Sequence, residues 1–225
     1  MHGGFWDGSR RAILGSFTAF GLAFVMSYGV GSTYPAAFAA EPTTTETIVI
    51  LRHGEKPEAG LGQLDCQGLN RSLALPAVMG KMFGRPDAIF APDPSEMKSD
   101  QGHLYNYIRP LATVEPLAVS LGMPIDTSIG VSNIDALRAK LETPAYRSAL
   151  AFIAWEHNEI PKLTRQLVSD SGGDPAVVSD WDRQDFDSIY VIKITRTGGN
   201  STVIFDHRHE SLNGQPKSCP TTMPR

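Results

Sequence analysis

The chain has 225 residues, of which 41% are hydrophobic and 20% are charged, and its formal net charge at pH 7 is −4. These values are typical of a soluble globular protein, and they leave no surplus of basic residues for binding nucleic acid. We therefore expect no nucleic-acid partner.

The first 39 residues differ in kind from the rest. Their formal charges are confined to one aspartate and two adjacent arginines, namely Asp7, Arg10 and Arg11. Residues 9–14 resemble the twin-arginine export motif, an uncharged stretch follows, and residues 37–39 form a small-x-small cleavage pattern. We expect a cleaved export signal, a periplasmic or extracellular protein, and no stable membrane insertion after cleavage. The alternative is an uncleaved membrane anchor, because the uncharged stretch is just long enough to span a bilayer.

Cleavage after Ala39 leaves 186 of the 225 residues, which is enough for one domain with a substantial core. The removed segment carries two positive charges and one negative charge, so the net charge changes from −4 to −5. We expect residues 40–46 to be a short polar leader and residues 47–225 to form the domain. Both cysteines, Cys66 and Cys219, lie in this domain, and an exported protein with an even count can form a disulfide. Two free thiols are the alternative.

The domain opens with a predicted strand at residues 47–51, where every side chain is β-branched or aliphatic. Such a run is typical of a strand that is buried on both faces of a sheet. Arg52 and His53 follow at its carboxyl end, where open α/β sheets bind their ligands. Gly54 allows the backbone to turn tightly and to approach a bound group. This strand end predicts an anion site that contains a nucleophile.

Helical and strand patterns then alternate along the chain. The predicted elements are a helix that Asp65 opens, a strand at 87–91, a helix at 105–121 that Pro110 and Pro116 bend or split, a strand at 123–125, a helix capped by Asn133 or Asp135, a strand at 148–157 and a helix at 160–168. Residues 188–195 and 201–206 predict two strands joined by a hairpin turn. The alternation predicts an α/β three-layer sandwich, with a mostly parallel central sheet flanked by helices and a C-terminal β-hairpin.

Three motifs in order resemble the histidine phosphatase superfamily, which has the phosphoglycerate-mutase-like fold. They are Leu51-Arg52-His53-Gly54-Glu55 after a buried strand, Arg109 with Thr113 four residues later, and Trp155-Glu156-His157 closing a late apolar strand. Residues 64–70 also sit where the first helix of that family begins. Three motifs, each in the expected structural context, form a strong signal, whereas a lone Arg-His-Gly would be weak. The resemblance covers residues 47 to about 168 and implies a phosphatase that forms a phosphohistidine.

The same residue types suit this chemistry without the family. Arg52 and Arg109 can each offer planar, paired donors that match phosphate oxygens. A neutral imidazole at His53 is a competent nucleophile near neutral pH, because the unperturbed pKa of histidine is about 6.5. His157 can donate to phosphoryl oxygens as their charge changes in the transition state. We expect no metal or other cofactor, since the arginines supply the positive charge.

The proton donor to the leaving group is the least determined part of the site. Some relatives carry an aspartate directly after the second histidine, and this chain has Asn158 there. Glu159 is the first choice because it is nearest to His157 in sequence. The other candidates are three acidic residues, Glu55, Asp126 and Asp135.

The remaining histidines of the domain are not assigned to the site. His103 either lines the pocket or lies in a solvated loop. His207 and His209 lie two residues apart and could hold a metal, but a surface strand explains them better without further ligands.

The expected function is a phosphomonoesterase that acts on a small phosphorylated substrate outside the cytoplasm. One alternative is a mutase that moves phosphate within a sugar acid, against which export argues. The other is a catalytically silent phosphate- or phosphosugar-binding protein of the cell envelope. The loops at residues 56–62 and 92–106 should shape the pocket, and nothing in the sequence specifies an oligomeric state.

Overall fold

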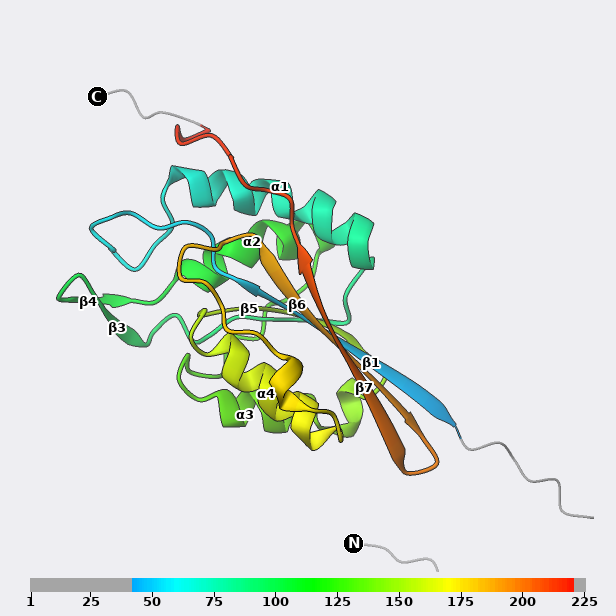
Figure 1. Cartoon of the computed structure of the whole chain (residues 1–225). Helices are drawn as coiled ribbons and strands as arrows, with labels where there is room; N and C mark the ends of the chain where they lie inside the picture. Colours follow the sequence, from blue (N-terminus) through cyan, green and yellow to red (C-terminus); the bar gives the residue numbers. More distant parts are fainter. Residues whose placement is uncertain (1–41, 221–225) are drawn as a thin grey trace, which may run out of the picture. The chain divides into compact units, whose positions relative to one another are not determined.

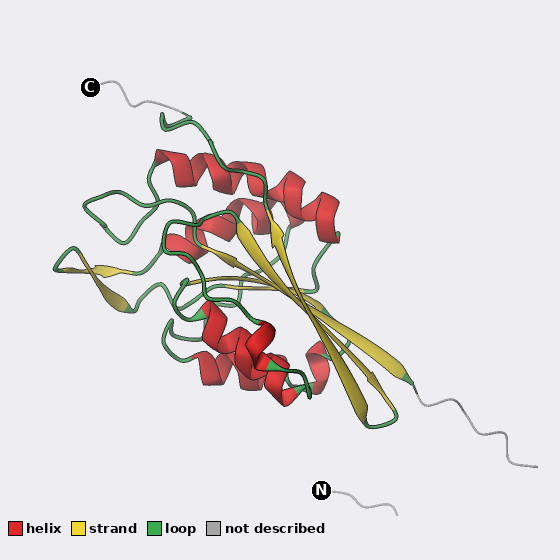
Figure 2. Cartoon of the chain, in the orientation of Figure 1, coloured by secondary structure: helices red, strands yellow, loops and turns green. Residues whose placement is uncertain are grey.

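A computed structural model describes residues 42–220, in which a five-stranded sheet lies between two pairs of helices (Figures 1 and 2). The strands are β1 (Thr43–Arg52), β2 (Ala88–Phe90), β3 (Met97–Asp100), β4 (His103–Asn106), β5 (Leu150–Trp155), β6 (Ser188–Thr197) and β7 (Asn200–His209). The helices are α1 (Cys66–Phe83), α2 (Arg109–Leu121), α3 (Ile134–Leu141) and α4 (Ile160–Asp170), with short 3₁₀ helices at Pro144–Tyr146 and Pro175–Val177. The proposed export signal, residues 1–39, lies outside the described residues.

The main sheet has the strand order β2-β5-β1-β6-β7. The strands β2, β5 and β1 run parallel, while β6 and β7 form an antiparallel hairpin on the other side of β1. The α/β class and the C-terminal hairpin are therefore confirmed, with a central sheet that is mixed. The register pairs Arg52 at the end of β1 with Trp155 at the end of β5. The residues that follow these two strands must therefore emerge at the same edge of the sheet.

Helices α1 and α2 cover one face of the sheet, and α3 and α4 cover the other (Figure 2). Along β1, Val49 and Leu51 belong to the apolar cluster of the first face, while Ile48 and Ile50 belong to that of the second. All four side chains are fully buried. This two-sided burial is the physical reason why the strand has an unbroken apolar sequence rather than an alternating one.

Strand β1 begins at Thr43, so the prediction of a polar leader up to residue 46 is wrong for residues 43–46. The strand β6 is long enough to pair with them, from Thr43 opposite Thr197 to Glu46 opposite Ile194. Threonine side chains suit a strand. Glu46 is tolerated there because its carboxylate lies 2.8 Å from the Arg196 guanidinium.

The segment before α2 also differs from the prediction. The strands β3 and β4 form a separate two-stranded sheet where a polar loop and the start of a helix were expected. Helix α2 begins only at Arg109, since Pro110 suits the first turn of a helix. Pro116 lies inside α2, which continues unbroken to Leu121, so the expected split does not occur.

The structure also decides two further predictions, the strand at residues 123–125 and the N-cap of α3. The strand expected at residues 123–125 is absent, and a single bridge between Phe90 and Asp126 stands in its place. Asn133 rather than Asp135 caps α3, because its side chain accepts a hydrogen bond from the backbone N–H of Ala136.

The predicted disulfide between Cys66 and Cys219 is present. It ties the segment after β7 to the first residue of α1. Asn70 on α1 strengthens this junction by donating to the carbonyl oxygens of Pro216 and Ser218. Within residues 42–220, no helix combines the length and the apolar character that a membrane span requires.

Candidate active site

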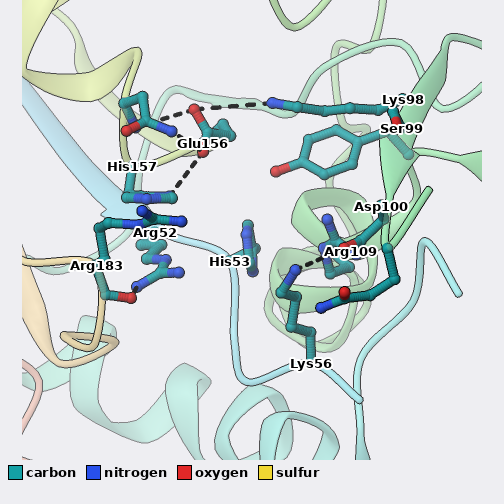
Figure 3. Close-up of a pocket in the computed structure, with 13 residues that line it drawn as sticks. Arg52, His53, Lys56, Lys98, Ser99, Asp100, Arg109, Glu156, His157 and Arg183 are labelled. Atoms are coloured by element: carbon teal, nitrogen blue, oxygen red, sulfur yellow. Dashed lines mark hydrogen bonds and ion pairs between the residues drawn. The ribbon is translucent and has the colours of Figure 1, made fainter. Parts of the chain in front are cut away.

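A cavity of about 310 Å³ lies where β1 and β5 end, and Figure 3 shows the side chains around it. Its lining residues are Arg52, His53, Lys56, Lys98, Ser99, Asp100, Gln101, Tyr107, Arg109, Glu156, His157, Asn158 and Arg183. Four residues predicted from the sequence are therefore brought together, namely Arg52, His53, Arg109 and His157. The roles assigned to them remain predictions.

His53 is buried, with 2% of its surface exposed, and its Nδ1 lies 2.7 Å from the carbonyl oxygen of Gly54. A carbonyl oxygen can only accept, so Nδ1 carries the hydrogen and Nε2 carries the lone pair. Burial, reinforced by the charges of Arg52 and Arg109, holds the pKa of His53 well below its ordinary value. The ring is therefore neutral at pH 7, with Nε2 as its basic atom.

Thr113 connects the loop after His53 to helix α2. Its hydroxyl oxygen accepts from the backbone N–H of Gly54 at 2.9 Å and donates to the carbonyl oxygen of Arg109 at 2.9 Å. Gly54 itself approaches α1 so closely that an added Cβ would lie 3.1 Å from the backbone of Gly68. The four-residue spacing from Arg109 to Thr113 thus has a physical reason, because the threonine joins the turn that carries His53 to the helix that carries the arginine.

Arg52 is held by the loop before β6. Its guanidinium donates to the carbonyl oxygens of Arg183 and Asp185, both at 2.8 Å, and lies 3.8 Å from the ring centroid of Phe186. Burial lowers the pKa of Arg52 to about 10, so the side chain remains a cation at neutral pH. Its Nε is buried and has no hydrogen-bond partner among the described residues.

Arg109 lies on the other side of His53 from Arg52 (Figure 3). Its Nη1 is 2.5 Å from a carboxylate oxygen of Asp100, whose second oxygen lies 2.7 Å from Nζ of Lys56. Burial alone would raise the pKa of Asp100, but the hydrogen bonds from Lys56 and Arg109 outweigh it and hold that pKa below its ordinary value. The Nε of Arg109 is buried and, within residues 42–220, unpaired.

Glu156 and His157 approach the cavity from the end of β5. One carboxylate oxygen of Glu156 lies 2.7 Å from Nδ1 of His157, and the carboxylate also accepts from the backbone and side-chain nitrogens of Asn158, each at 2.9 Å. Burial would raise the pKa of Glu156, but the contact with His157 and the charge of Lys98 outweigh it and lower the pKa to about 2. Glu156 is thus ionised, and its carboxylate lies against the ring of His157.

The structure does not bring the predicted proton donors into the cavity. Glu159 directly precedes α4, and its carboxylate pairs with Lys162 three residues later at 3.0 Å, so the first choice is not supported. The other three candidates also pair elsewhere, Glu55 with Arg71, Asp126 with Lys140 and Asp135 with Arg138. Each of these carboxylates has a partner on a neighbouring element or turn that sequence proximity to His157 could not reveal.

The other histidines lie outside the site. His103 is on β4 and does not line the cavity. His207 bonds to the hydroxyl of Ser188 through Nε2 at 2.7 Å, and the ring of His209 stacks near it. Residues 42–220 contain no group of three or more side chains placed to hold a metal ion.

Sequence reasoning missed several lining residues, of which the charged ones are Lys98, Asp100, Glu156 and Arg183. Two of these side chains belong to the β3–β4 hairpin, which the sequence pattern did not predict. Glu156 directly precedes His157 in the quoted motif, so its place beside the second histidine was the one available signal. The two loops expected to shape the pocket do so through Lys56 and residues 98–101.

No family model matches the chain, and no curated protein matches its sequence. Among solved structures, it is similar to the "putative phosphohistidine phosphatase SixA" of Nakamurella multipartitia, with a TM-score of 0.46 and 14% identity over 72% of this chain and 96% of that one. It is also similar to the protein of the same description from Agrobacterium tumefaciens, with a TM-score of 0.42 and 15% identity over 72% of this chain and 97% of that one. The function proposed below therefore rests on the side chains of the cavity.

Proposed function

We propose that this protein is an exported phosphomonoesterase that acts on small phosphorylated substrates through a phosphohistidine on His53. Arg52, Arg109 and His157 hold the phosphate in this mechanism. The chain belongs, on this proposal, to the histidine phosphatase superfamily that its three motifs resemble.

The observation that carries the proposal is the pair of unsatisfied arginine donors around His53. Nε of Arg52 and Nε of Arg109 are both buried without a partner among residues 42–220, although buried polar groups are nearly always hydrogen-bonded. Phosphate oxygens would satisfy both N–H groups with charge-assisted bonds. The cavity also has five basic side chains, Arg52, Lys56, Lys98, Arg109 and Arg183, against two acidic ones, Asp100 and Glu156. Such an excess of positive charge favours a dianion.

The neutral ring of His53 supplies the nucleophile. Its Nε2 lone pair attacks phosphorus, the bond to the leaving oxygen breaks, and water later hydrolyses the phosphohistidine to release inorganic phosphate. The guanidinium groups stabilise the phosphoryl oxygens, and His157, whose Nδ1 faces Glu156, donates from Nε2. These groups supply the positive charge that metal ions supply at other phosphoryl-transfer sites, so no cofactor is proposed.

Export is the second part of the proposal. Disulfides persist in oxidising compartments and are rare in the cytosol, so the Cys66–Cys219 bond supports a protein that works outside the cytoplasm.

The decisive experiment is the hydrolysis of p-nitrophenyl phosphate by the protein and by its His53→Ala variant. We expect His53→Ala to lose at least about 10³-fold in turnover, because the residue that forms the covalent bond is gone. His103→Ala is the matched control, since His103 lies on β4 outside the cavity, and it should keep its activity. Turnover retained by His53→Ala would reject the mechanism. Phosphate binding without any turnover by the unmodified protein would favour the silent binding protein instead.

A further inference from the structure

Tyr107 lies between β4 and α2, and nothing in the mechanism above uses it. The side chain lines the cavity and is buried, with 1% of its surface exposed. Its hydroxyl has no hydrogen-bond partner among the residues that the structure describes. A buried tyrosine hydroxyl usually finds a partner, so an unpaired one that lines a reactive cavity points to an interaction with a ligand.

The Tyr107 ring lies beside the nucleophile and between two cations. The ring centroid lies 4.8 Å from the guanidinium of Arg109 and 5.0 Å from Nζ of Lys98. The imidazole of His53 lies with its centroid 6.0 Å away and its plane at 88° to the phenol ring. The phenol therefore shares the cavity with the nucleophile, and the charge of Arg109 offsets part of the cost of forming a phenolate there.

The two carboxylates of the cavity are unsuited to giving a proton. Asp100 accepts hydrogen bonds from Lys56 and Arg109, and Glu156 accepts two from Asn158. Both are held ionised by these contacts, and an ionised carboxylate cannot act as an acid.

Tyr107 differs from these carboxylates in keeping its proton. Burial raises the pKa of Tyr107 above its ordinary value, against the opposing charge of Arg109, so the hydroxyl is protonated at neutral pH. Even a phenol whose pKa is raised above about 10 can protonate an alkoxide, because the conjugate acid of an alkoxide is about as weak an acid as water, with a pKa of about 16.

We propose that Tyr107 is the proton donor to the leaving oxygen, an inference that rests on the phosphatase function proposed above. As Nε2 of His53 bonds to phosphorus, the bond from phosphorus to the leaving oxygen breaks, and the proton on Oη of Tyr107 moves to that oxygen. In the second half-reaction the tyrosinate takes a proton from water. The water oxygen bonds to phosphorus, the phosphorus–nitrogen bond breaks, and the electron pair returns to Nε2 of His53.

The test compares Tyr107→Phe with the unmodified protein on two esters that differ in leaving group. An alkoxide from a simple alkyl phosphate needs a proton, whereas the p-nitrophenolate from p-nitrophenyl phosphate is stable without one. We expect kcat/KM of Tyr107→Phe to fall about 10²–10⁴-fold on the alkyl ester and less than about tenfold on the aryl ester. Tyr146→Phe is the control, because Tyr146 packs against Phe90 and does not line the cavity, and it should behave as the unmodified protein on both.

A loss of equal size on both esters would overturn the proposal, because it would mean that the hydroxyl only binds phosphate or supports the fold. So would a loss on neither, or an unmodified protein that hydrolyses the aryl ester but not the alkyl ester. If the unmodified protein hydrolyses neither ester, the phosphatase function itself fails, and the role of Tyr107 fails with it.

The pH profile gives a second readout. With Tyr107 as donor, the ratio of turnover on the alkyl ester to turnover on the aryl ester should not decline between pH 7 and 9, where a phenol stays protonated. A decline centred below pH 7 would indicate a carboxylic acid instead.

Discussion

Arg71 and Arg109 are both buried arginines that face carboxylates, yet their surroundings differ. Arg71, on α1, is fully buried, and its guanidinium binds four side chains, Glu55, Asp187, Glu210 and Asn213. Its Nε, Nη1 and Nη2 all have partners at 2.7–3.3 Å. Arg109 uses only Nη1, toward Asp100, and its buried Nε has no partner within the described part of the chain.

The difference separates a structural arginine from one that is placed for a ligand. Around Arg71, three acidic side chains surround one cation, whereas in the cavity the basic side chains outnumber the acidic ones. The partners of Arg71 also come from separate segments, two of which carry residues of the site. Glu55 follows the His53 loop, Asp187 ends the loop that holds Arg52, and Glu210 belongs to the segment that the disulfide ties to α1. We infer that the Arg71 cluster fixes these loops, while the cavity performs the chemistry.

The largest effect on stability should come from Arg71→Met. The methionine fills much of the same volume but leaves the carboxyl groups of Glu55, Asp187 and Glu210 without their shared cation, so we expect a loss of about 3–5 kcal/mol in the free energy of unfolding. Urea denaturation measures it. The folded fraction should keep kcat/KM for p-nitrophenyl phosphate within about tenfold. Arg165→Met is the control, because Arg165 pairs with the exposed Asp180 and such surface pairs contribute about 1 kcal/mol or less.

Arg109→Met should show the opposite pattern. We expect kcat/KM to fall about 10²–10³-fold, because a donor to the phosphoryl oxygens is lost. The free energy of unfolding should change by only about 1 kcal/mol, since Asp100 keeps its bond to Lys56. If Arg109→Met lost several kcal/mol of stability but kept its activity, Arg109 would be a structural arginine like Arg71.

The sequence predicted those features of the cavity that depend on where strands end and on the spacing of residues within a motif. The unbroken apolar run of β1 predicted a doubly buried strand, and parallel strands that end in histidines predicted that Arg52, His53 and His157 would meet. The spacing from Arg109 to Thr113 placed the second arginine correctly. Each of these signals is local, because side-chain periodicity and the termination of a strand are written in consecutive residues.

The Arg71 cluster and the acidic side of the cavity had no such signal. Arg71 meets Glu55 across 16 residues and Glu210 across 139, and a single sequence contains no record of contacts at that range. Asp100 was missed because the β3–β4 hairpin is short and polar, without the alternating apolar residues that identify a strand. Glu159 was preferred for its nearness to His157 along the chain, but its carboxylate pairs with Lys162 on α4 and does not line the cavity.

Glu210 offers the smallest and most specific test of the comparison. It is buried with 2% of its surface exposed, and one of its oxygens has no partner among residues 42–220. Burial, with the repulsion of Asp187 and Glu55, raises its pKa from 4.5 to about 8 against the opposing charge of Arg71. The Arg71 cluster therefore holds a protonated carboxyl at neutral pH, in contrast to the ionised Asp100 and Glu156 of the cavity.

A raised native pKa means that the folded protein binds a proton that the unfolded chain has already released. The resulting stabilisation is fully present below about pH 4.5 and is lost as the pH rises through about 8, by at most about 1.4 kcal/mol per pH unit.

Glu210→Gln mimics the protonated form and removes this dependence. The variant should match the unmodified protein near pH 5 and exceed its stability at pH 8–9 by about 1–3 kcal/mol, as measured by urea denaturation across this range. Glu142→Gln, at a half-exposed carboxylate paired with Arg138, should follow the unmodified protein throughout. If the free energy of unfolding of Glu210→Gln and of the unmodified protein changed with pH in the same way, Glu210 would be ionised in the folded protein. Arg71 would then be surrounded by three ionised carboxylates.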